Sequence, residues 1–274
     1  MPKVNVRHLE QGLVVDNVEI GFLTHVGLRR EHNEDNYYVF DPDGCDCSDR
    51  GMLFAVADGM GGHAAGETAS RIAVETLRDY YADEFDGSFR DKLERLIGEA
   101  NCRIYSQAQT SPTLRGMGTT LTVALLTSTT LNLGQIGDSR AYLVRGKAIT
   151  QLTDDHSLVA EQIRQGILTE EEAANHPARN IITRALGTKE KVEADFSTCA
   201  LEPDDRVLVC SDGLHGVVPN DELLRIVLAS PDAPVACERL IARANEGGGP
   251  DNITVIIFHL RPFRPFWKRL LFWR

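Results

Sequence analysis

Four aspartates in this sequence share one setting: each stands at an end of an apolar run, and three are directly beside glycine. A turn explains any one of them, because aspartate and glycine both favour turns. Taken together they are better explained by a common site, where glycine lets the backbone approach a bound group closely. The four are Asp58, Asp138, Asp212 and Asp251, and the acidic pair Glu34 and Asp35 precedes a further apolar run.

A cluster of these acids needs a positive counter-charge. Two carboxylates about 4 Å apart repel by roughly 4 kcal/mol at an effective dielectric constant of about 20. The segments 56–67, 207–220 and 246–256 contain no lysine or arginine, so bound cations are the natural counter-charge. Carboxylates, carbonyls and water select hard cations such as magnesium, manganese or calcium. We therefore predict a hard-cation site built from these acids.

The chemistry that such a site supports is hydrolysis of a phosphate ester. Two hard cations about 3.5–4 Å apart generate hydroxide near neutral pH and clamp phosphoryl oxygens. Arg30 lies four residues before Glu34, and a guanidinium group binds phosphate through two parallel hydrogen bonds. No cysteine lies in a phosphate-cradling loop, which argues against a phosphatase with a thiolate nucleophile.

The elements that must position these residues follow from the apolar spacing. Helical spacing covers 69–80 and 89–104, and Ser88 with Asp91 forms a capping-box-like start for the second helix. Clustered strands and paired helices favour an α+β fold with largely antiparallel sheets. The expected strands are 52–57, 119–126, 131–136, 141–144, 206–210 and 253–258, and the later helices are 161–165, 222–228 and 235–244.

No linker, internal repeat or low-complexity segment divides the chain, so residues 1–260 are expected to form a single domain. The stretch 158–178 carries alternating charge, a glycine at 166 and the pair His176–Pro177. This pattern is typical of an excursion from the main layers, and such segments often form flaps beside a substrate site.

The composition narrows the class of protein. The 274 residues include 29 basic and 40 acidic side chains, a net charge of −11, which argues against nucleic-acid binding because phosphates are held by clustered lysine and arginine. The start has no apolar run of signal-peptide length, and no stretch of 18 apolar residues occurs. We therefore expect a cytoplasmic protein whose six cysteines are reduced. Cys45 and Cys47 lack the second close pair that a zinc site needs.

The segment 261–274 differs from the rest of the chain. It holds five basic residues, no acidic ones and both tryptophans, so the other 260 residues have 24 basic against 40 acidic side chains, or −16. A basic-aromatic tail of this kind can lie on an anionic membrane surface or dock on an acidic partner. Packing against its own domain is the equally weighted alternative. A peripheral location at the membrane therefore stays open.

Six motifs in order, spread from about residue 20 to 260, are specific enough to name a family. The sequence resembles the metal-dependent protein Ser/Thr phosphatases, the PPM or type 2C family, and looks most like the compact bacterial branch. One run such as Gly-Asp-Ser-Arg is weak evidence, whereas six in the family's order are not a chance match. The runs are Arg30 to Asn36, Val56 to His63, Gly116 to Thr120, Gly137 to Arg140, Ser211 to Leu214 and Pro250 to Thr254.

The resemblance implies a fold and a metal centre. The fold would be a four-layer α-β-β-α sandwich of two antiparallel sheets flanked by helices, with two or three divalent cations, manganese or magnesium, in a cleft at one edge. Asp58 would bridge the two core metals, and the Gly59 carbonyl would bind one of them. Asp212 and Asp251 would hold the metal on the other side.

The remaining site residues are also implied by the resemblance. Glu34 and Asp35 would act mainly through metal-bound water, and Asp138, with Asp212, matches the position of a third, weaker metal. Arg30 would bind the substrate phosphate. The segment 158–178 falls on the family's variable flap. Thr119 and Thr120 are expected to support the core strand, Asn252 to brace the Asp251 loop, and His156 and His215 to be surface or hydrogen-bonded histidines.

One position departs from the animal members of the family. They carry a histidine, proposed as general acid, where this chain has Met60, a residue that bacterial members commonly have. The general acid is therefore unassigned. The alternatives are water on the third metal, which is favoured, and His63.

The activity implied is hydrolysis of phosphoserine and phosphothreonine in proteins by a metal-bridging hydroxide, with Arg30 and Asp58 as the central catalytic pair and without a phosphoenzyme. A Ser/Thr kinase would be the opposing partner. One alternative is a catalytically silent regulatory or binding module on the same fold, which loss of a metal-binding aspartate would favour; none is lost. Another is a hydrolase of a different phosphoester.

Overall fold

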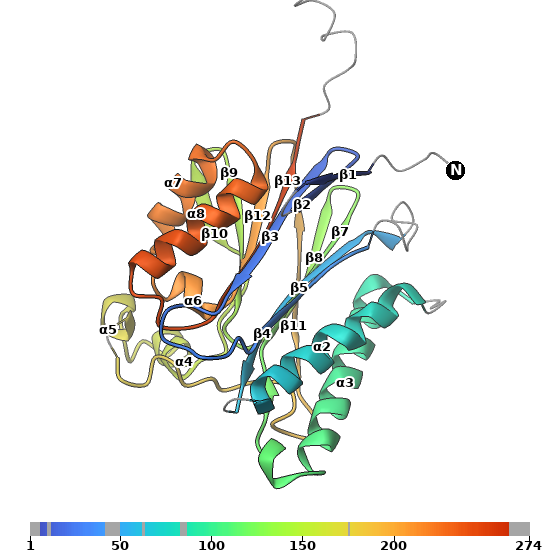
Figure 1. Ribbon diagram of the computed structural model, residues 1–274, viewed down its shortest axis with the longest axis vertical. Helices are drawn as coiled ribbons and strands as arrows, with labels where there is room; N and C mark the ends of the chain where they lie inside the picture. The colour runs from blue at the N-terminus through green and yellow to red at the C-terminus, as the bar shows by residue number, and fades with distance from the viewer. Residues whose placement is uncertain are drawn as a thin grey trace, which may run out of the picture.

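The computed structural model describes residues 6–9, 12–41, 50–61, 64–82, 87–174 and 176–262. Two antiparallel sheets lie face to face, and a pair of helices covers the outer face of each (Figure 1). This arrangement confirms the predicted α+β sandwich of four layers. Among the described residues, no helix combines the length and the apolarity needed to cross a bilayer.

The first sheet has seven strands. Antiparallel pairing joins each strand to the next. In spatial order the strands are β1 (Val6–Leu9), β2 (Gly12–Val15), β3 (Val18–His25), β13 (Ile253–Leu260), β12 (Arg206–Cys210), β9 (Arg140–Arg145) and β10 (Ala148–Gln151).

The second sheet has five strands in its main path and a short sixth that pairs with the end of β5. Its pairs are antiparallel too. In spatial order the strands are β11 (Asp195–Ala200), β8 (Thr130–Ile136), β7 (Leu121–Thr127), β5 (Met52–Met60) and β4 (Asp35–Val39), and the short strand is β6 (Gly118–Thr119).

Two helix pairs close the sandwich. Helices α2 (Ala64–Ala82) and α3 (Phe89–Ala108) cover the second sheet, and α7 (Asn220–Ala229) and α8 (Ala233–Glu246) cover the first (Figure 1). The predicted capping box at the start of α3 is confirmed: the backbone N–H of Asp91 donates to Ser88 Oγ at 3.2 Å, and that of Ser88 donates to Asp91 Oδ2 at 3.1 Å.

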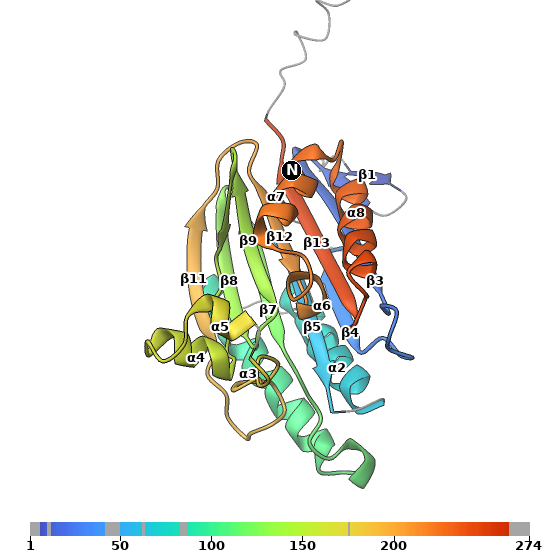
Figure 2. The same ribbon diagram turned by 90° about the vertical axis from the view of Figure 1, so that its left-hand side faces the viewer.

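The shorter helices gather at one end of the sandwich. The one-turn helix α6 (Asp212–His215) directly follows β12, and a 3-10 turn, η1 (Pro112–Leu114), follows α3. Helices α4 (Leu158–Arg164) and α5 (Glu170–Ala174) belong to neither outer pair and lie at the same end as α6 in both views (Figures 1 and 2). They occupy the stretch for which the sequence predicts an excursion.

The core has two parts, and alternation along the strands divides residues between them. In β12, Val207 and Val209 face the layer between the sheets, whereas Leu208 and Cys210 face the helices α7 and α8. The rings of Phe54 in β5 and Phe258 in β13 stack between the sheets, with centroids 4.5 Å apart. Burial on both faces explains why β12 and β13 appear in the sequence as continuous apolar runs.

The predicted helices and strands are present, with shifted ends. Strand β5 continues beyond the predicted 52–57 to Met60, because Asp58 pairs with Asp35 of β4 and Gly59 pairs with Thr119 of β6. The strands β1, β2, β3, β4, β10 and β11 were not predicted. Cys45, Cys47, His63 and the tail beyond Pro262 lie outside the described residues, so the predictions about them stay predictions.

Candidate active site

The register of the strands brings the predicted acids to one end of the sandwich. Asp35, the first residue of β4, lies directly opposite Asp58 near the end of β5. In the other sheet, Cys210 at the end of β12 pairs with Arg140, the first residue of β9, and with Val255 near the start of β13. The turn 137–139 precedes β9, Asp212 follows β12 and Asp251 precedes β13, so these acids occupy the same end.

Asp35 connects the two sheets at this end. Its Oδ2 atom accepts hydrogen bonds from Ser211 Oγ at 2.8 Å and from Thr254 Oγ1 at 2.7 Å, and these donors belong to the ends of β12 and β13. Its Oδ1 atom is buried and has no hydrogen-bond partner among the described residues. Burial raises the pKa of the Asp35 carboxyl to about 7.

Three more carboxyl groups lie in the same unfavourable environment. Burial, followed by repulsion from neighbouring carboxylates, raises the pKa of Asp138 to about 7 and that of Asp212 to about 6. The same two causes raise the pKa of Asp58 well above its ordinary value. Asp138 and Asp212 each have a buried Oδ1 atom that lacks a hydrogen-bond partner in the described part of the chain.

This set of carboxyl groups fits hard divalent cations. Buried carboxylate oxygens without donors repel one another, and a cation is the counter-charge that they can share. Within the described ranges, no three His, Cys, Asp or Glu side chains form a complete ligand set for one ion. Magnesium-like ions do not require such a set, because one or two carboxylates, completed by carbonyls and water, commonly hold them.

The backbone around Asp58 is fixed by the two threonines of the Gly-Thr-Thr motif. The Asp58 N–H donates to Thr120 Oγ1 at 2.9 Å, and the Asp58 carbonyl accepts from Thr119 Oγ1 at 2.9 Å. The Thr120 N–H donates to the same carbonyl at 2.9 Å. The predicted supporting role of Thr119 and Thr120 is therefore confirmed. Met60, at the end of β5, pairs with Gly118.

Glu34 and Gly59 meet at the first turn of α2. The Glu34 carbonyl accepts hydrogen bonds from the Gly59 N–H at 3.2 Å and from Ser70 Oγ of α2 at 2.6 Å. A carboxyl oxygen of Glu34 and the Gly59 carbonyl group both pack on Gly66, where a Cβ atom would overlap them. A glycine at position 66 thus permits this close approach.

The acids gathered at this end of the sandwich are called the acid group below; they are Glu34, Asp35, Asp58, Asp138, Asp212 and Asp251. Arg30 and Asp251 form an ion pair at its edge. Arg30 Nη2 donates to Asp251 Oδ2 at 2.8 Å, and 52% of the Arg30 side chain remains exposed. Asn252 braces the Asp251 loop, as predicted, and joins it to the loop between β3 and β4. Its Oδ1 accepts from the Glu34 N–H at 2.8 Å, and its Nδ2 donates to the Val26 carbonyl at 2.9 Å. The two loops are therefore held in a fixed relation.

A cleft connects the acid group to the excursion that contains α4 and α5. Its volume is about 520 Å³, and its lining includes Asp138, Asp212 and His215 together with Arg164 of α4 and Arg179. The expected flap segment thus lines the same cleft as two of the predicted metal ligands.

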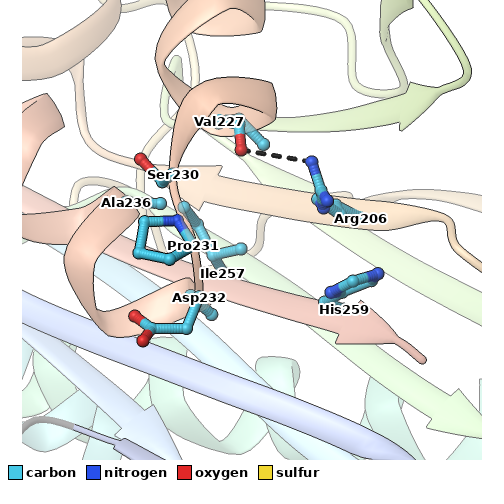
Figure 3. A pocket seen from close by; sticks show the side chains of 9 residues that line it. Arg206, Val227, Ser230, Pro231, Asp232, Ala236, Ile257 and His259 are labelled. Carbon is cyan, nitrogen blue, oxygen red and sulfur yellow. Dashed lines mark hydrogen bonds between the residues drawn. The ribbon is translucent and has the colours of Figure 1, made fainter. Parts of the chain in front are cut away.

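A second, smaller pocket lies at the opposite end of the sandwich. It is lined by Arg206, the first residue of β12, and by His259, which pairs with Arg206 near the end of β13 (Figure 3). Arg206 Nη1 donates to the Val227 carbonyl at 3.2 Å. None of the acids that the sequence predicts for the metal site lines this pocket.

The sequence analysis missed the hydroxyl groups that hold Asp35. Ser211 ends the apolar run of β12 and Thr254 interrupts that of β13. Both side chains are fully buried. A polar residue inside an otherwise apolar strand was the signal available, but only the pairing of β12 with β13 shows what it contacts.

Comparisons with known proteins agree on the family of this fold and site. The protein phosphatase 2C family model matches residues 29–239, a range that includes every predicted acid except Asp251. The serine/threonine phosphatase stp of Listeria monocytogenes is 40% identical over 240 residues, which cover 86% of this chain and 93% of that protein.

Solved structures extend the likeness. The crystal structure of the catalytic domain of the serine/threonine protein phosphatase PstP, in complex with two manganese ions, has a TM-score of 0.78 and 37% identity, and covers 89% of this chain and 99% of that one. Stp1 from Staphylococcus aureus has a TM-score of 0.83 and 32% identity, and covers 94% and 100%.

Proposed function

The chain belongs to the protein phosphatase 2C family, and from this premise we propose that the acid group is the active site of a metal-dependent phosphatase acting on phosphoserine and phosphothreonine in proteins. The observation that carries the proposal is the set of buried carboxyl oxygens on Asp35, Asp138 and Asp212 that have no hydrogen-bond partner in the described part of the chain. The relative PstP, which binds two manganese ions, supports manganese or magnesium as the cation.

Each acid has a proposed role in holding cations. Asp58 would be shared by two ions, with the Gly59 carbonyl on one of them and Asp212 and Asp251 on the other. Glu34 and Asp35 would act mainly through water. Asp138, together with Asp212, would hold a third and weaker ion.

Ions held there would supply hydroxide from water near neutral pH and neutralise charge on the phosphoryl oxygens. The chain's own contribution is to position the phosphate. The ion pair with Asp251 keeps the Arg30 guanidinium at the rim of the acid group, where more than half of its side chain is open to solvent. A guanidinium in this position can bind two phosphate oxygens and fix the phosphorus atom over the acids.

The proposal is tested by phosphate release from a phosphothreonine peptide with manganese, run beside a phosphotyrosine peptide and in the presence of EDTA. We expect hydrolysis of the phosphothreonine peptide only, abolished by EDTA and by Asp58→Asn or Asp212→Asn. Activity that survives EDTA, or that persists in each of the two single variants, would contradict the metal mechanism. Preference for a non-protein phosphoester would contradict the substrate class.

We also propose that residues 1–260 are the catalytic domain, that about 158–178 is its flap, and that the protein reverses the action of a Ser/Thr kinase. For the tail 261–274 we propose contact with an anionic membrane or an acidic partner. Leu260 pairs with Val18 and Ile253 with His25, so the root of the tail and the acid end lie at opposite ends of β13, about 24 Å apart at 3.4 Å per residue.

This separation makes the tail proposal testable apart from catalysis. Deletion of residues 262–274, which keeps the ion pair of Arg261 with Glu19, should reduce sedimentation with phosphatidylserine vesicles while leaving peptide hydrolysis unchanged. Unchanged sedimentation would refute the membrane contact.

A further inference from the structure

Two histidines, His156 and His215, hold the turn that carries Asp138, and neither has a role in the proposed chemistry. His156 is almost fully buried, with 1% of its surface exposed. The His156 Nδ1 atom accepts a hydrogen bond from the Gly137 N–H at 3.1 Å, and the backbone N–H of His156 donates to the Gly137 carbonyl at 2.9 Å. One residue thus holds both the backbone N–H and the backbone carbonyl of Gly137, the residue before Asp138.

The second ring nitrogen of His156 reaches the edge strand β11. His156 Nε2 lies 2.9 Å from Asp195 Oδ2, and Arg184 Nη1 donates to the other oxygen of this carboxylate at 2.9 Å. Because Nδ1 accepts from the Gly137 N–H, the ring proton must be on Nε2, where it is donated to Asp195. Asp195 and Arg184 therefore maintain the tautomer in which His156 can hold Gly137.

His156 also stands where the two ends of the flap meet. It directly precedes Ser157, the N-cap of α4, and Ser157 pairs with Ile182 on the returning chain. The Thr183 N–H donates to the His156 carbonyl at 2.8 Å, and the Leu158 N–H donates to the Ile181 carbonyl at 2.9 Å. The base of the flap and the Asp138 turn thus share this one buried residue.

His215 completes the restraint of the turn from the opposite side. Its Nε2 atom lies 2.9 Å from the Asp138 carbonyl oxygen. A carbonyl oxygen can only accept a hydrogen bond, so the Nε2–H of His215 is the donor in this contact. His215 is part of α6, which begins with Asp212. The restrained backbone leaves Asp138 Oδ1 buried and without a hydrogen-bond partner in the described residues.

We propose that His156 is a positioning residue, which fixes the Asp138 carboxylate for cation binding and couples that position to the base of the flap through Asp195 and Arg184. The inference rests on the proposed function, because the position of Asp138 matters only if this acid holds a cation. No sequence motif indicates this role, since Asp195 is 39 residues from His156.

Two conservative substitutions separate the two ring nitrogens. In His156→Asn, the side-chain oxygen can occupy the place of Nδ1 and still accept from Gly137. In His156→Gln, the longer amide can reach Asp195 but presents no acceptor at the place of Nδ1. A role in packing alone would not distinguish the two variants, whereas the positioning role predicts that only His156→Gln impairs the Asp138 site.

The experiment is calorimetric titration of the metal-stripped full-length chain with manganese. We expect Asp138→Asn to lose the weakest binding step and His156→Gln to weaken it by about tenfold, the size of effect typical for residues that orient a metal ligand. His156→Asn should stay within about threefold of the unsubstituted chain. The matched control is His259→Asn, because His259 Nε2 also lies close to an aspartate, Asp204, at 2.8 Å, but at the opposite end of the sandwich.

The outcomes separate the two proposals. If Asp138→Asn binds manganese like the unsubstituted chain, the proposed cation site at this acid is wrong. If Asp138→Asn loses the weakest step but His156→Gln keeps it, or if Asn and Gln at position 156 are equally impaired, the positioning role is wrong.

A second substitution and a second measurement cover the case that His156→Gln does not fold. Asp195→Ala changes a half-exposed residue at the start of β11 and should weaken the same step several-fold, since the His156 tautomer is released; an unchanged step overturns the proposal. Saturating manganese should slow hydrogen exchange of the Thr183 amide in the unsubstituted chain and not in Asp195→Ala. Equal slowing in both would contradict the coupling to the flap.

Discussion

At the scale of single residues, the site depends on neutral groups that hold the acids in position. Asp35 is buried in the central layer, and hydroxyl groups from two strands of the other sheet donate to one of its oxygens. A donor to a buried carboxylate stabilises its charged form, which burial alone would disfavour. The hydroxyls therefore keep Asp35 both in place and available to a cation.

Substitution of Thr254 tests this support. Thr254→Val keeps the shape of the side chain but removes the 2.7 Å hydrogen bond to Asp35. We expect a loss of about 1–3 kcal/mol in the free energy of unfolding, because a buried polar group loses a partner. We also expect roughly tenfold weaker manganese binding, measured by calorimetry.

Thr76→Val is the matched control for Thr254→Val. Thr76 is equally buried, and its hydroxyl donates to the Ile72 carbonyl within α2 at 2.8 Å. The control should leave manganese binding unchanged. If both variants bind manganese like the unsubstituted chain, Thr254 has no role in positioning Asp35.

At the scale of secondary structure, the close approach of α2 to the end of β5 shapes one side of the site. Gly66 in the first turn of α2 lies against the Gly59 carbonyl group and the Glu34 carboxyl. We expect Gly66→Ala to displace both groups and to reduce manganese-dependent peptide hydrolysis by at least tenfold, in line with the sensitivity of such sites to small displacements.

Gly98→Ala is the control for this helix substitution. Gly98 lies inside α3, and a Cβ atom there would meet nothing within 4 Å. This variant should gain about 0.5–1 kcal/mol in the free energy of unfolding, since alanine loses less backbone entropy in a helix than glycine, and keep full activity. Full activity of Gly66→Ala would show that the close packing on Gly66 is not needed.

The elements also show how far the sequence predicts the fold and the site. The strands buried on both faces, β12 and β13, were predicted because their apolar runs are continuous. Strand β11 was not, because it lies at an edge of its sheet and is mostly exposed, so its residues show no apolar run. The acids were identified from their place beside strand ends and glycine.

The contacts between distant segments could not be predicted from the sequence. Pairing of β12 with β13 brings Ser211 and Thr254 to Asp35, and the meeting of the flap ends brings His156 to Gly137. These contacts depend on the register between strands and on the folded course of the flap. Neither leaves a local pattern in the sequence.

At the scale of the whole molecule, part of the excess of acidic residues is gathered at one end of the sandwich. The carboxyl groups with raised pKa values belong to segments far apart in sequence that meet at one end of the sandwich. Two or three divalent ions would add about four to six positive charges there. An end of the molecule that repels phosphate when metal-free would then attract it.

The raised pKa values predict how stability depends on pH in the metal-stripped chain. Asp35, Asp138 and Asp212 have pKa values of about 6 to 7, against 3.8 for the ordinary carboxyl. Between pH 4 and 7 the folded chain therefore holds more protons at these groups than the unfolded chain does, so their contribution to stability falls as pH rises.

Thermal unfolding in EDTA across this pH range measures the effect. The melting temperature should fall more steeply between pH 5 and 7.5 for the unsubstituted chain than for Asp138→Asn, which lacks one of the raised groups. Manganese should restore the melting temperature at pH 7.5 by binding the folded state. Identical pH profiles of the two chains would be evidence against the carboxyl repulsion described above.

The central claim is that the acids at this end of the sandwich hold divalent cations for phosphoester hydrolysis. Its most direct test is anomalous diffraction at the manganese absorption edge from crystals of the full-length chain grown with manganese. We predict two strong peaks beside Asp58, one of them also beside Asp212 and Asp251, and loss of both peaks in Asp58→Asn. Strong manganese peaks elsewhere, with none beside Asp58, would contradict the account.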